Sequence, residues 1–200
     1  LQALIDAVQS GVIRHANIVL VVSNNPDALG LKRANEANIE TLVRSHKKYP
    51  TRVAFDLAIH EELVKRGIDL VCLAGFMRIL SKEFVALWKG RVLNTHPSLL
   101  PAFKGHDAHR LVLEAGVRIS GCTVHFVEVE VDAGAVILQH PVPVFPRDTL
   151  ESLQERVKGA EHVVYPRALE AVASGAVVYD AGRAIWKSQP PIPDCFSTFP

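Results

Sequence analysis

Apolar residues form two kinds of run in the first half of this 200-residue chain. Continuous runs rich in Val and Ile cover residues 17–23 and 69–75, as in strands that are buried on both faces of a parallel sheet. Residues 27–38 and 52–66 have helical spacing instead. The apolar face of the second helix consists of Phe55, Ile59, Leu63 and Val64. A strand–helix–strand order of this kind predicts parallel strands joined by a right-handed crossover.

The chain already follows a helical pattern at its first residue. Leu1, Leu4, Ile5 and Val8 have the i, i+3, i+4, i+7 spacing of an amphipathic helix. We therefore expect the chain to open inside a structural element, with a segment missing upstream.

The second half of the chain predicts a short helix followed by three strands. Ser81 is the expected N-cap of the helix, and residues 91–94 form a short strand that Pro97 ends. Residues 122–127 and 135–144 are apolar and are joined by a short acidic segment. They predict a pair of antiparallel strands.

A long helix and a hairpin are expected after these strands. Asp148 and Glu151 have the spacing of a capping box, which predicts a helix over residues 149–173. Pro166 is expected to kink or split that helix because proline removes a backbone donor. A weak hairpin of residues 176–179 and 184–187 follows.

These elements predict one α/β domain over residues 1–187. Its sheet is expected to be Rossmann-like, open and mixed, mostly parallel, with helices on both faces and the first strand missing. Residues 188–200 contain four prolines and are expected to form a disordered or draped tail.

Composition excludes several classes of protein. A formal net charge of +1 gives no field that would attract nucleic acid or an anionic membrane surface. No apolar run approaches the ~20 residues of a membrane span. Cys72, Cys122 and Cys195 are too few and too far apart for a disulfide framework or a metal site. We therefore expect a reducing compartment, the cytoplasm, and no metal.

The most informative segment is Asn94-Thr-His96, at the end of a predicted strand. Residues i and i+2 of a strand project to the same face, so both side chains would enter the crevice beyond its carboxyl end. An amide donor beside an imidazole suits acyl transfer, because both can stabilise an oxyanion and histidine can move a proton. Taken alone, the pair is better explained as an Asn in a turn and a satisfied core His.

The residues after His96 narrow this choice. Asn94-Thr-His96 followed by Ser-Leu-Leu-Pro resembles the folate-dependent formyltransferase superfamily. The phosphoribosylglycinamide formyltransferases are more similar still, through four further motifs. These motifs are CLAGFMRILS (72–81), GCTVHFV (121–127), VDAG (131–134) and RVKGAEH (156–162).

The resemblance implies transfer of the formyl group of 10-formyltetrahydrofolate to the amine of glycinamide ribonucleotide, in purine synthesis. Asn94 and a protonated His96 would stabilise the oxyanion. Asp132 would pair with His96, since a nearby carboxylate favours an imidazolium. Without the resemblance, Asp132 is better explained as a turn residue between two strands.

The resemblance also implies a folate site. The pterin would lie between two segments: Met77, Arg78, Ile79 and Leu80 on one side, and Glu128, Val129, Glu130, Val131 and Asp132 on the other. Asn94 would border the same site, and Arg52 would meet the glutamate tail. The alternatives are that the apolar residues of the first segment belong to the core and that Arg52 is a solvated charge.

The ribonucleotide would contact the predicted long helix. The implied residues are Lys158, Gly159, Ala160 and Glu161. Lys158 and Glu161 share one helix face, so a surface ion pair is the alternative explanation.

Members of this family begin with a strand and a glycine-rich turn before the helix that here starts at Leu1. We therefore expect either a fragment of a longer protein or a departure from the family, with a gap or exposed strand edges in the sheet. A module of a larger purine-synthesis polypeptide fits the same observation.

Two other functions remain open. A formyltetrahydrofolate deformylase shares the Asn-x-His…Asp set but hydrolyses the cofactor; residues 76–80 and the Lys158–Glu161 pair argue against it. The second alternative is a catalytically inactive, truncated product that only binds folate.

Overall fold

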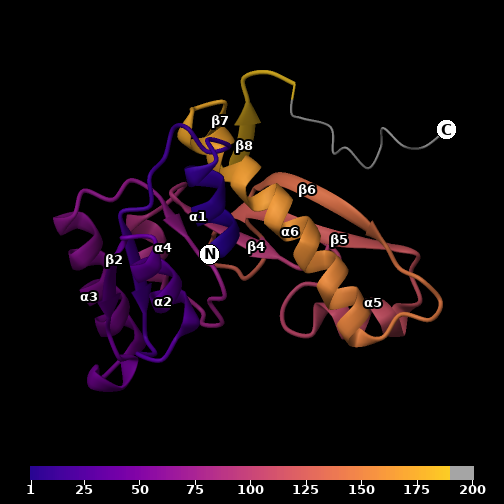
Figure 1. Ribbon diagram of the computed structural model, residues 1–200, viewed down its shortest axis with the longest axis horizontal. Helices are drawn as coiled ribbons and strands as arrows, with labels where there is room; N and C mark the ends of the chain where they lie inside the picture. The colour runs from indigo at the N-terminus through magenta and orange to yellow at the C-terminus, as the bar shows by residue number, and fades with distance from the viewer. Residues whose placement is uncertain (190–200) are drawn as a thin grey trace.

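The computed structural model describes residues 1–189. Helices and strands alternate in the first half, and the longest strands and the longest helix lie in the second half (Figure 1). The elements are α1 Gln2–Gln9, β1 Leu20–Ser23, α2 Leu29–Glu36, β2 Glu40–Val43, a short 3-10 helix His46–Lys48, α3 Arg52–Lys65, β3 Val71–Cys72, α4 Lys82–Leu87, β4 Val92–His96, α5 Ala108–Ala115, β5 Ile119–Phe126, β6 Val136–Pro143, α6 Leu150–Ala173, β7 Val177–Asp180 and β8 Arg183–Trp186.

The described strands form three sheets. β1 pairs in parallel with β2, and β3, β4, β5 and β6 form a four-stranded sheet in that order. Within this sheet β3, β4 and β6 run in one direction and β5 runs against them, so the sheet is mixed and mostly parallel, as predicted. β7 and β8 form a separate hairpin.

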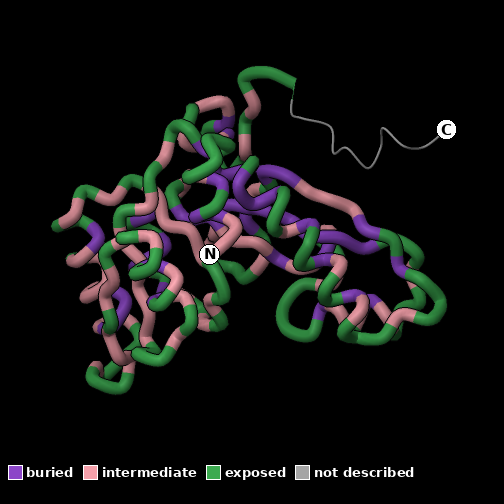
Figure 2. Tube along the Cα trace, viewed as in Figure 1, coloured by how far each residue is buried: buried purple, intermediate pink, exposed green. Residues whose placement is uncertain are grey.

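Helices cover both faces of the four-stranded sheet. Leu93 packs in a cluster with residues of α1 and α6, whereas its neighbour Val92 packs with Leu63 of α3 and Trp88, the residue that ends α4. Successive residues of a strand point to opposite faces, so the two clusters lie on opposite sides of β4. Figure 2 shows the burial running along β5 and β6 beneath α6.

Local signals explain where several helices begin. The Thr51 hydroxyl accepts a hydrogen bond from the Ala54 amide at the start of α3, and Ser81 caps α4 through the Phe84 amide. The expected cap at Ser81 is therefore confirmed. The buried Asp56 carboxylate also accepts from the Ser81 amide, at 2.6 Å, which ties α3 to the start of α4.

The gap expected in the sheet lies between β1 and β3. These two strands belong to different sheets, and among the described residues no strand pairs with the second edge of β1. Both strands are half-buried rather than fully buried, although Val71 and Cys72 of β3 pack against clusters on opposite faces, as predicted. An unpaired edge leaves backbone and side chains open to solvent, which is why the burial is incomplete.

Other expectations need correction as well. Val64 is exposed, although its spacing predicts a place on the buried face of α3. Strand β2 and helix α5 are absent from the predicted elements; β2 is short with exposed ends, whereas α5 has a short apolar face that buries Ala108 and Val112. α6 is not split at Pro166, since buried residues before and after the proline hold the helix against the sheet.

The capping box of α6 also differs from the prediction. Thr149 is the N-cap, and it exchanges hydrogen bonds with Ser152 rather than with Glu151. Asp148 instead binds Arg156, with an Oδ2–N distance of 2.7 Å. Asp148 also accepts hydrogen bonds of 2.8 Å from the Ser152 hydroxyl and the Phe145 amide, so it supports the start of α6 without being the N-cap.

No helix of residues 1–189 is both long and apolar enough to cross a membrane. The hairpin expected after α6 is confirmed as β7 and β8. Most of the proline-rich tail, from residue 190, lies outside the described residues.

Candidate active site

Two neighbouring strands place four polar side chains on one face of the sheet. On β4 these are Asn94 and His96, and on β5 they are His125 and Thr123, directly opposite. Antiparallel partners share a face, so the four side chains form a compact patch. The predicted convergence of Asn94 and His96 is therefore confirmed, and β5 adds a second pair to it.

Asp132 reaches this patch from the loop between β5 and β6. Its Oδ2 lies 3.3 Å from His96 Nδ1 and accepts a hydrogen bond of 2.8 Å from the Gly105 amide. Asp132 has a φ of +53°, a left-handed conformation that Asp tolerates better than most residues. Gly134 allows the loop to press on β5, because a Cβ there would lie 1.8 Å from the Phe126 carbonyl oxygen.

Both ring nitrogens of His96 face oxygen acceptors. Nδ1 faces the Asp132 carboxylate, and Nε2 lies 2.8 Å from the carbonyl oxygen of Phe103. A carbonyl oxygen and an ionised carboxylate can only accept hydrogen bonds, so a ring that carries both protons satisfies both contacts. The side chains of His96 and Asp132 are 6% and 7% exposed, which shields their attraction from solvent.

His125 differs from His96 because one of its ring nitrogens faces an acceptor and the other faces a donor. Burial lowers its pKa, so the ring is neutral near pH 7. Its Nδ1 donates to the Phe126 carbonyl, and its Nε2 accepts from the Asn94 amide nitrogen at 3.4 Å. Nε2 also lies 3.7 Å from Asp132. Because His125 is neutral, it does not form an ion pair with Asp132, and its Nε2 orients the Asn94 amide.

The predicted substrate residues of α6 lie on the other face of the sheet. The Glu161 carboxylate is 3.4 Å from the hydroxyl of Thr95, which points away from Asn94 and His96. Burial raises the pKa of Glu161, against the opposing effects of the Thr95 hydrogen bond and the Lys158 charge. Lys158 and Gly159 are exposed, whereas Ala160 packs in the core beneath the helix.

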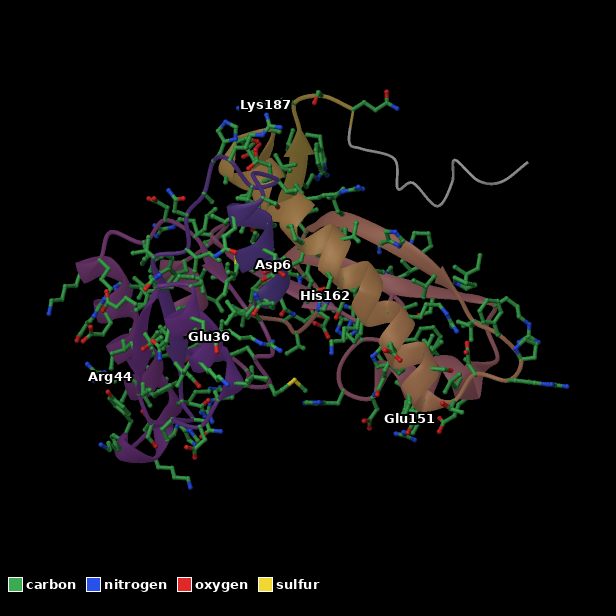
Figure 3. The ribbon with its side chains drawn as sticks, in the orientation of Figure 1. Asp6, Glu36, Arg44, Glu151, His162 and Lys187 are labelled. Carbon is green, nitrogen blue, oxygen red and sulfur yellow. The ribbon has the colours of Figure 1, made fainter. Side chains whose placement is uncertain are left out.

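Cationic groups surround Glu161. His162 follows it on α6, and Figure 3 shows His162 on the side of the helix near Asp6 of α1. Burial lowers the pKa of His162, and the charges of Lys158 and Arg33 lower it further. The opposite face of β4 therefore carries two carboxylates, Glu161 and Asp6, near the charges of Lys158 and Arg33.

The predicted folate residues lie at the more open edge of the sheet. Met77 is 75% exposed and Ile79 55% exposed, so these two residues are not core, whereas Leu80 packs against the cluster around Trp88. The Arg78 guanidinium lies over the Phe55 ring, 5.5 Å from its centre. Arg52 is exposed at the first residue of α3.

The second segment predicted to contact folate is residues 128–132. Its first residue is held by a hydrogen bond, and the next three residues are exposed. Glu128 accepts a hydrogen bond from the Tyr179 hydroxyl of β7, whereas Val129, Glu130 and Val131 are exposed. Glu130 lies 3.7 Å from Lys104 across the mouth of the site.

The sequence pattern does not identify every member of the site. It gives no signal for the carbonyl of Phe103, and His125 alone is explained as well by a structural role. The alternation of Thr123 and His125 along β5 is a signal, but it becomes informative only when the register with β4 is known. Among the described residues, no group of three His, Cys, Asp or Glu side chains could hold a metal ion.

An amide donor, an imidazole that contacts two oxygen acceptors, and a carboxylate lie together at the carboxyl end of a strand in an open α/β sheet, an arrangement that suits acyl transfer. Residues 1–169 match the formyl transferase family. The trifunctional purine biosynthetic protein adenosine-3 of Gallus gallus is 56% identical over 188 residues, which are 94% of this chain and 19% of that protein. The chain thus spans about a fifth of the length of that relative.

Shorter relatives match along most of their length. The phosphoribosylglycinamide formyltransferase of Escherichia coli (strain K12) is 44% identical over 88% of this chain and 82% of that protein. The structure of glycinamide ribonucleotide transformylase 1 from Symbiobacterium toebii aligns with a TM-score of 0.90 and 44% identity, over 94% of this chain and 88% of the other. The chain therefore belongs to the formyl transferase family, and within it to the phosphoribosylglycinamide formyltransferases.

The rival hydrolase is more distant. A formyltetrahydrofolate deformylase from Pseudomonas syringae pv. tomato aligns with a TM-score of 0.83 but is 25% identical, over 93% of this chain and 61% of that chain. The fold is therefore common to both enzymes, and sequence similarity favours the transferase.

Proposed function

We propose that this chain transfers the formyl group of 10-formyltetrahydrofolate to the amine of glycinamide ribonucleotide. The observation that carries the proposal is the meeting of His96 with Asp132 beside Asn94, in a chain 44% identical to two proteins named for this activity. The free thiols of Cys72 and Cys122 support a reducing compartment, the cytoplasm, as the place of the reaction.

The reaction proceeds by direct attack of the amine nitrogen on the formyl carbon. A new C–N bond forms, and the electron pair of the C=O double bond moves to oxygen to give a tetrahedral intermediate. Asn94 donates a hydrogen bond to this oxyanion, and the positive charge of His96 stabilises it from nearby. The intermediate then expels the folate nitrogen, which receives a proton, while the former amine loses one.

Asp132 and His125 keep the two catalytic groups in the required state. Asp132 holds Nδ1 of His96 and offsets its charge, and the neutral His125 accepts from the Asn94 amide. Neither residue needs to form a bond to the substrate. The atoms and charges balance without a covalent enzyme intermediate.

Binding of the two substrates follows the two faces of β4. The exposed apolar side chains of Met77 and Ile79 offer one wall for a flat heterocycle, and residues 128–131 offer the other. On the opposite face, Glu161 is a partner for hydroxyl or amine groups of the ribonucleotide, and Lys158 for its phosphate.

Steady-state kinetics with both substrates test the catalytic assignment. Asn94→Ala and His96→Ala should each lower kcat/KM by about 10²–10³, because each removes support for the oxyanion. Asn35→Ala and His15→Ala change the same residue types outside the site and should retain activity. Activity in the unchanged chain together with near-normal turnover in both site variants would contradict the proposal.

The hydrolase alternative is tested in the same preparation. We expect formate release from 10-formyltetrahydrofolate to stay at background, and formyl-ribonucleotide to appear only when glycinamide ribonucleotide is added. Formate release that does not depend on the amine substrate would identify a deformylase. Folate binding without any turnover would identify an inactive folate-binding chain.

A further inference from the structure

Three polar residues form a row across β4, β5 and β6, on the face of the sheet that carries Asn94 and His125. His96 on β4 is opposite Thr123 on β5, and Thr123 is opposite Gln139 on β6. Opposed residues share a face, so the row begins at the catalytic imidazole and continues away from it. Thr123 is fully buried, and nothing in the chemistry described above uses Thr123 or Gln139.

The hydroxyl of Thr123 uses its full hydrogen-bonding capacity. It donates to the Ser98 carbonyl at 2.7 Å and accepts from the Leu100 amide and from Gln139 Nε2, both at 3.0 Å. The Gln139 amide group donates a second bond, of 2.8 Å, to the Leu100 carbonyl. A hydroxyl has one proton and two lone pairs, so Thr123 has no unused position.

These bonds converge on the loop that follows β4. Thr123 and Gln139 hold three backbone groups of Ser98 and Leu100, and the Ser98 hydroxyl donates to the Ala102 carbonyl at 2.5 Å. Ala102 is followed by Phe103, whose carbonyl oxygen faces Nε2 of His96. Through this loop, the hydrogen bonds of Thr123 and Gln139 are linked back to His96.

We propose that Thr123 and Gln139 are positioning residues for the proposed formyl transfer. They hold residues 98–103 so that the Phe103 carbonyl stays on Nε2 of His96. An imidazole held at Nδ1 alone can turn about that contact, whereas one held at both nitrogens keeps its ring plane. The inference goes beyond the proposed function, on which its kinetic test rests.

Ser120 provides a matched control for this proposal. It lies on the same strand as Thr123, is also buried, and its hydroxyl has no hydrogen-bond partner in the described structure. Ser120→Ala therefore removes a buried hydroxyl from β5 without removing a bond. Thr123→Val removes the hydroxyl with its three bonds and keeps the shape, whereas Thr123→Ser keeps the hydroxyl.

Kinetics separate positioning from stability. Thr123→Val should lower kcat by about 10- to 100-fold and change the KM of either substrate by less than about threefold, because the substrates still bind but His96 is misplaced. Thr123→Ser should restore most of kcat, and Ser120→Ala should match the unchanged chain. An unchanged kcat in folded Thr123→Val, or a rise in KM alone, would overturn the proposal.

A second measurement does not depend on activity. In ¹H–¹⁵N spectra of the histidine rings, assigned with His96→Gln, the Nε2 proton of His96 should exchange slowly in the unchanged chain and in Ser120→Ala. It should exchange rapidly in Thr123→Val. Equal protection in all three proteins would contradict the positioning role, even if the chain shows no transferase activity.

Gln139→Met covers the case in which Thr123→Val does not fold. It removes the two amide donations and leaves the bonds of Thr123 to Ser98 and Leu100 in place. We expect the same loss of Nε2 protection and a smaller loss of kcat. A folded Gln139→Met protein with normal kcat and normal protection would overturn the proposal.

Discussion

Two parts of this chain are stabilised by different means: the β1–β2 sheet with α2 and α3, and the four-stranded sheet with α6. The β1–β2 sheet is half-exposed along its length, whereas all residues of β5 after Ile119 are buried (Figure 2). β2 and α3 are joined by a surface network in which Arg66 binds Glu40 and Glu62, at 2.7 Å for the closest Glu40 contact. Figure 3 shows Arg44, which also binds Glu62, in this part of the chain.

This difference corresponds to the division of function. The proposed catalytic patch lies on β4 and β5, where His96, Thr123 and His125 are buried and hydrogen-bonded. The exposed residues Met77 and Ile79, which are proposed to contact folate, follow β3 at the edge of the four-stranded sheet. Acyl transfer requires fixed donors, since their effect depends on alignment with the transition state. A binding surface must instead remain accessible.

The largest effect is expected at Gly134, where the loop between β5 and β6 that carries Asp132 contacts β5. Gly134→Ala would place a Cβ 1.8 Å from the Phe126 carbonyl oxygen, so the loop must move and take Asp132 with it. We expect kcat to fall by about 100-fold or more, measured under saturating substrates.

Gly30→Ala in α2 is the matched control for that change. Its Cβ would meet only the end of the flexible Leu1 side chain, at 3.2 Å, and alanine favours a helix. Normal activity is expected. Equal activity of both variants would mean that the loop can move without cost.

A pair of core truncations compares the stability of the two parts directly. Leu93→Ala on β4 removes a fully buried side chain and should lower the free energy of unfolding by about 3 kcal/mol. Leu20→Ala on β1 removes a half-buried one and should cost about 1 kcal/mol. Urea denaturation followed by circular dichroism measures both; equal losses would contradict the comparison.

The smallest effect concerns the surface network. The hydrogen bonds from Arg66 lower the pKa of Glu40 and of Glu62 below the ordinary carboxyl value. Their stabilisation is therefore complete above that ordinary value and is lost as the pH falls through the lowered pKa values. Arg66→Met should reduce stability slightly at pH 7, and the reduction should disappear in acid below those lowered values.

Urea denaturation at several pH values measures this difference. Lys48→Met, an equal change of charge at the nearby 3-10 helix, serves as the control. A difference between Arg66→Met and the unchanged chain that persists in acid would show that the arginine acts through packing rather than charge.

Elements with a strong local signal are predictable from the sequence. The runs that form β5 and β6, the helical spacing of α1 and α3, and the Ser81 cap all depend on interactions between residues near in sequence. β2 gives no such signal, that of α5 covers only two turns, and β1 and β3 are shorter and more exposed than predicted. Burial of a strand depends on which elements lie beside it, which local pattern does not determine.

The site shows the same division. The spacing of Asn94 and His96 alone predicts that they share one face, because a strand repeats every two residues. Family resemblance supplies Asp132, whose contact with His96 the structure confirms at 3.3 Å. The role of His125 does not follow from the sequence, because its pKa and its bond to Asn94 depend on burial and on strand register.

The sequence by itself determined the α/β class, the placing of Asn94 and His96 on one face at the end of β4 and, through resemblance, the family. Tertiary structure decided which groups complete that pair. Asp132, the Phe103 carbonyl and the Thr123–Gln139 row come from different segments, and only the pairing of β4, β5 and β6 brings them to one histidine. The physical reason is that hydrogen bonds act over about 3 Å, a proximity that sequence spacing cannot specify across a fold.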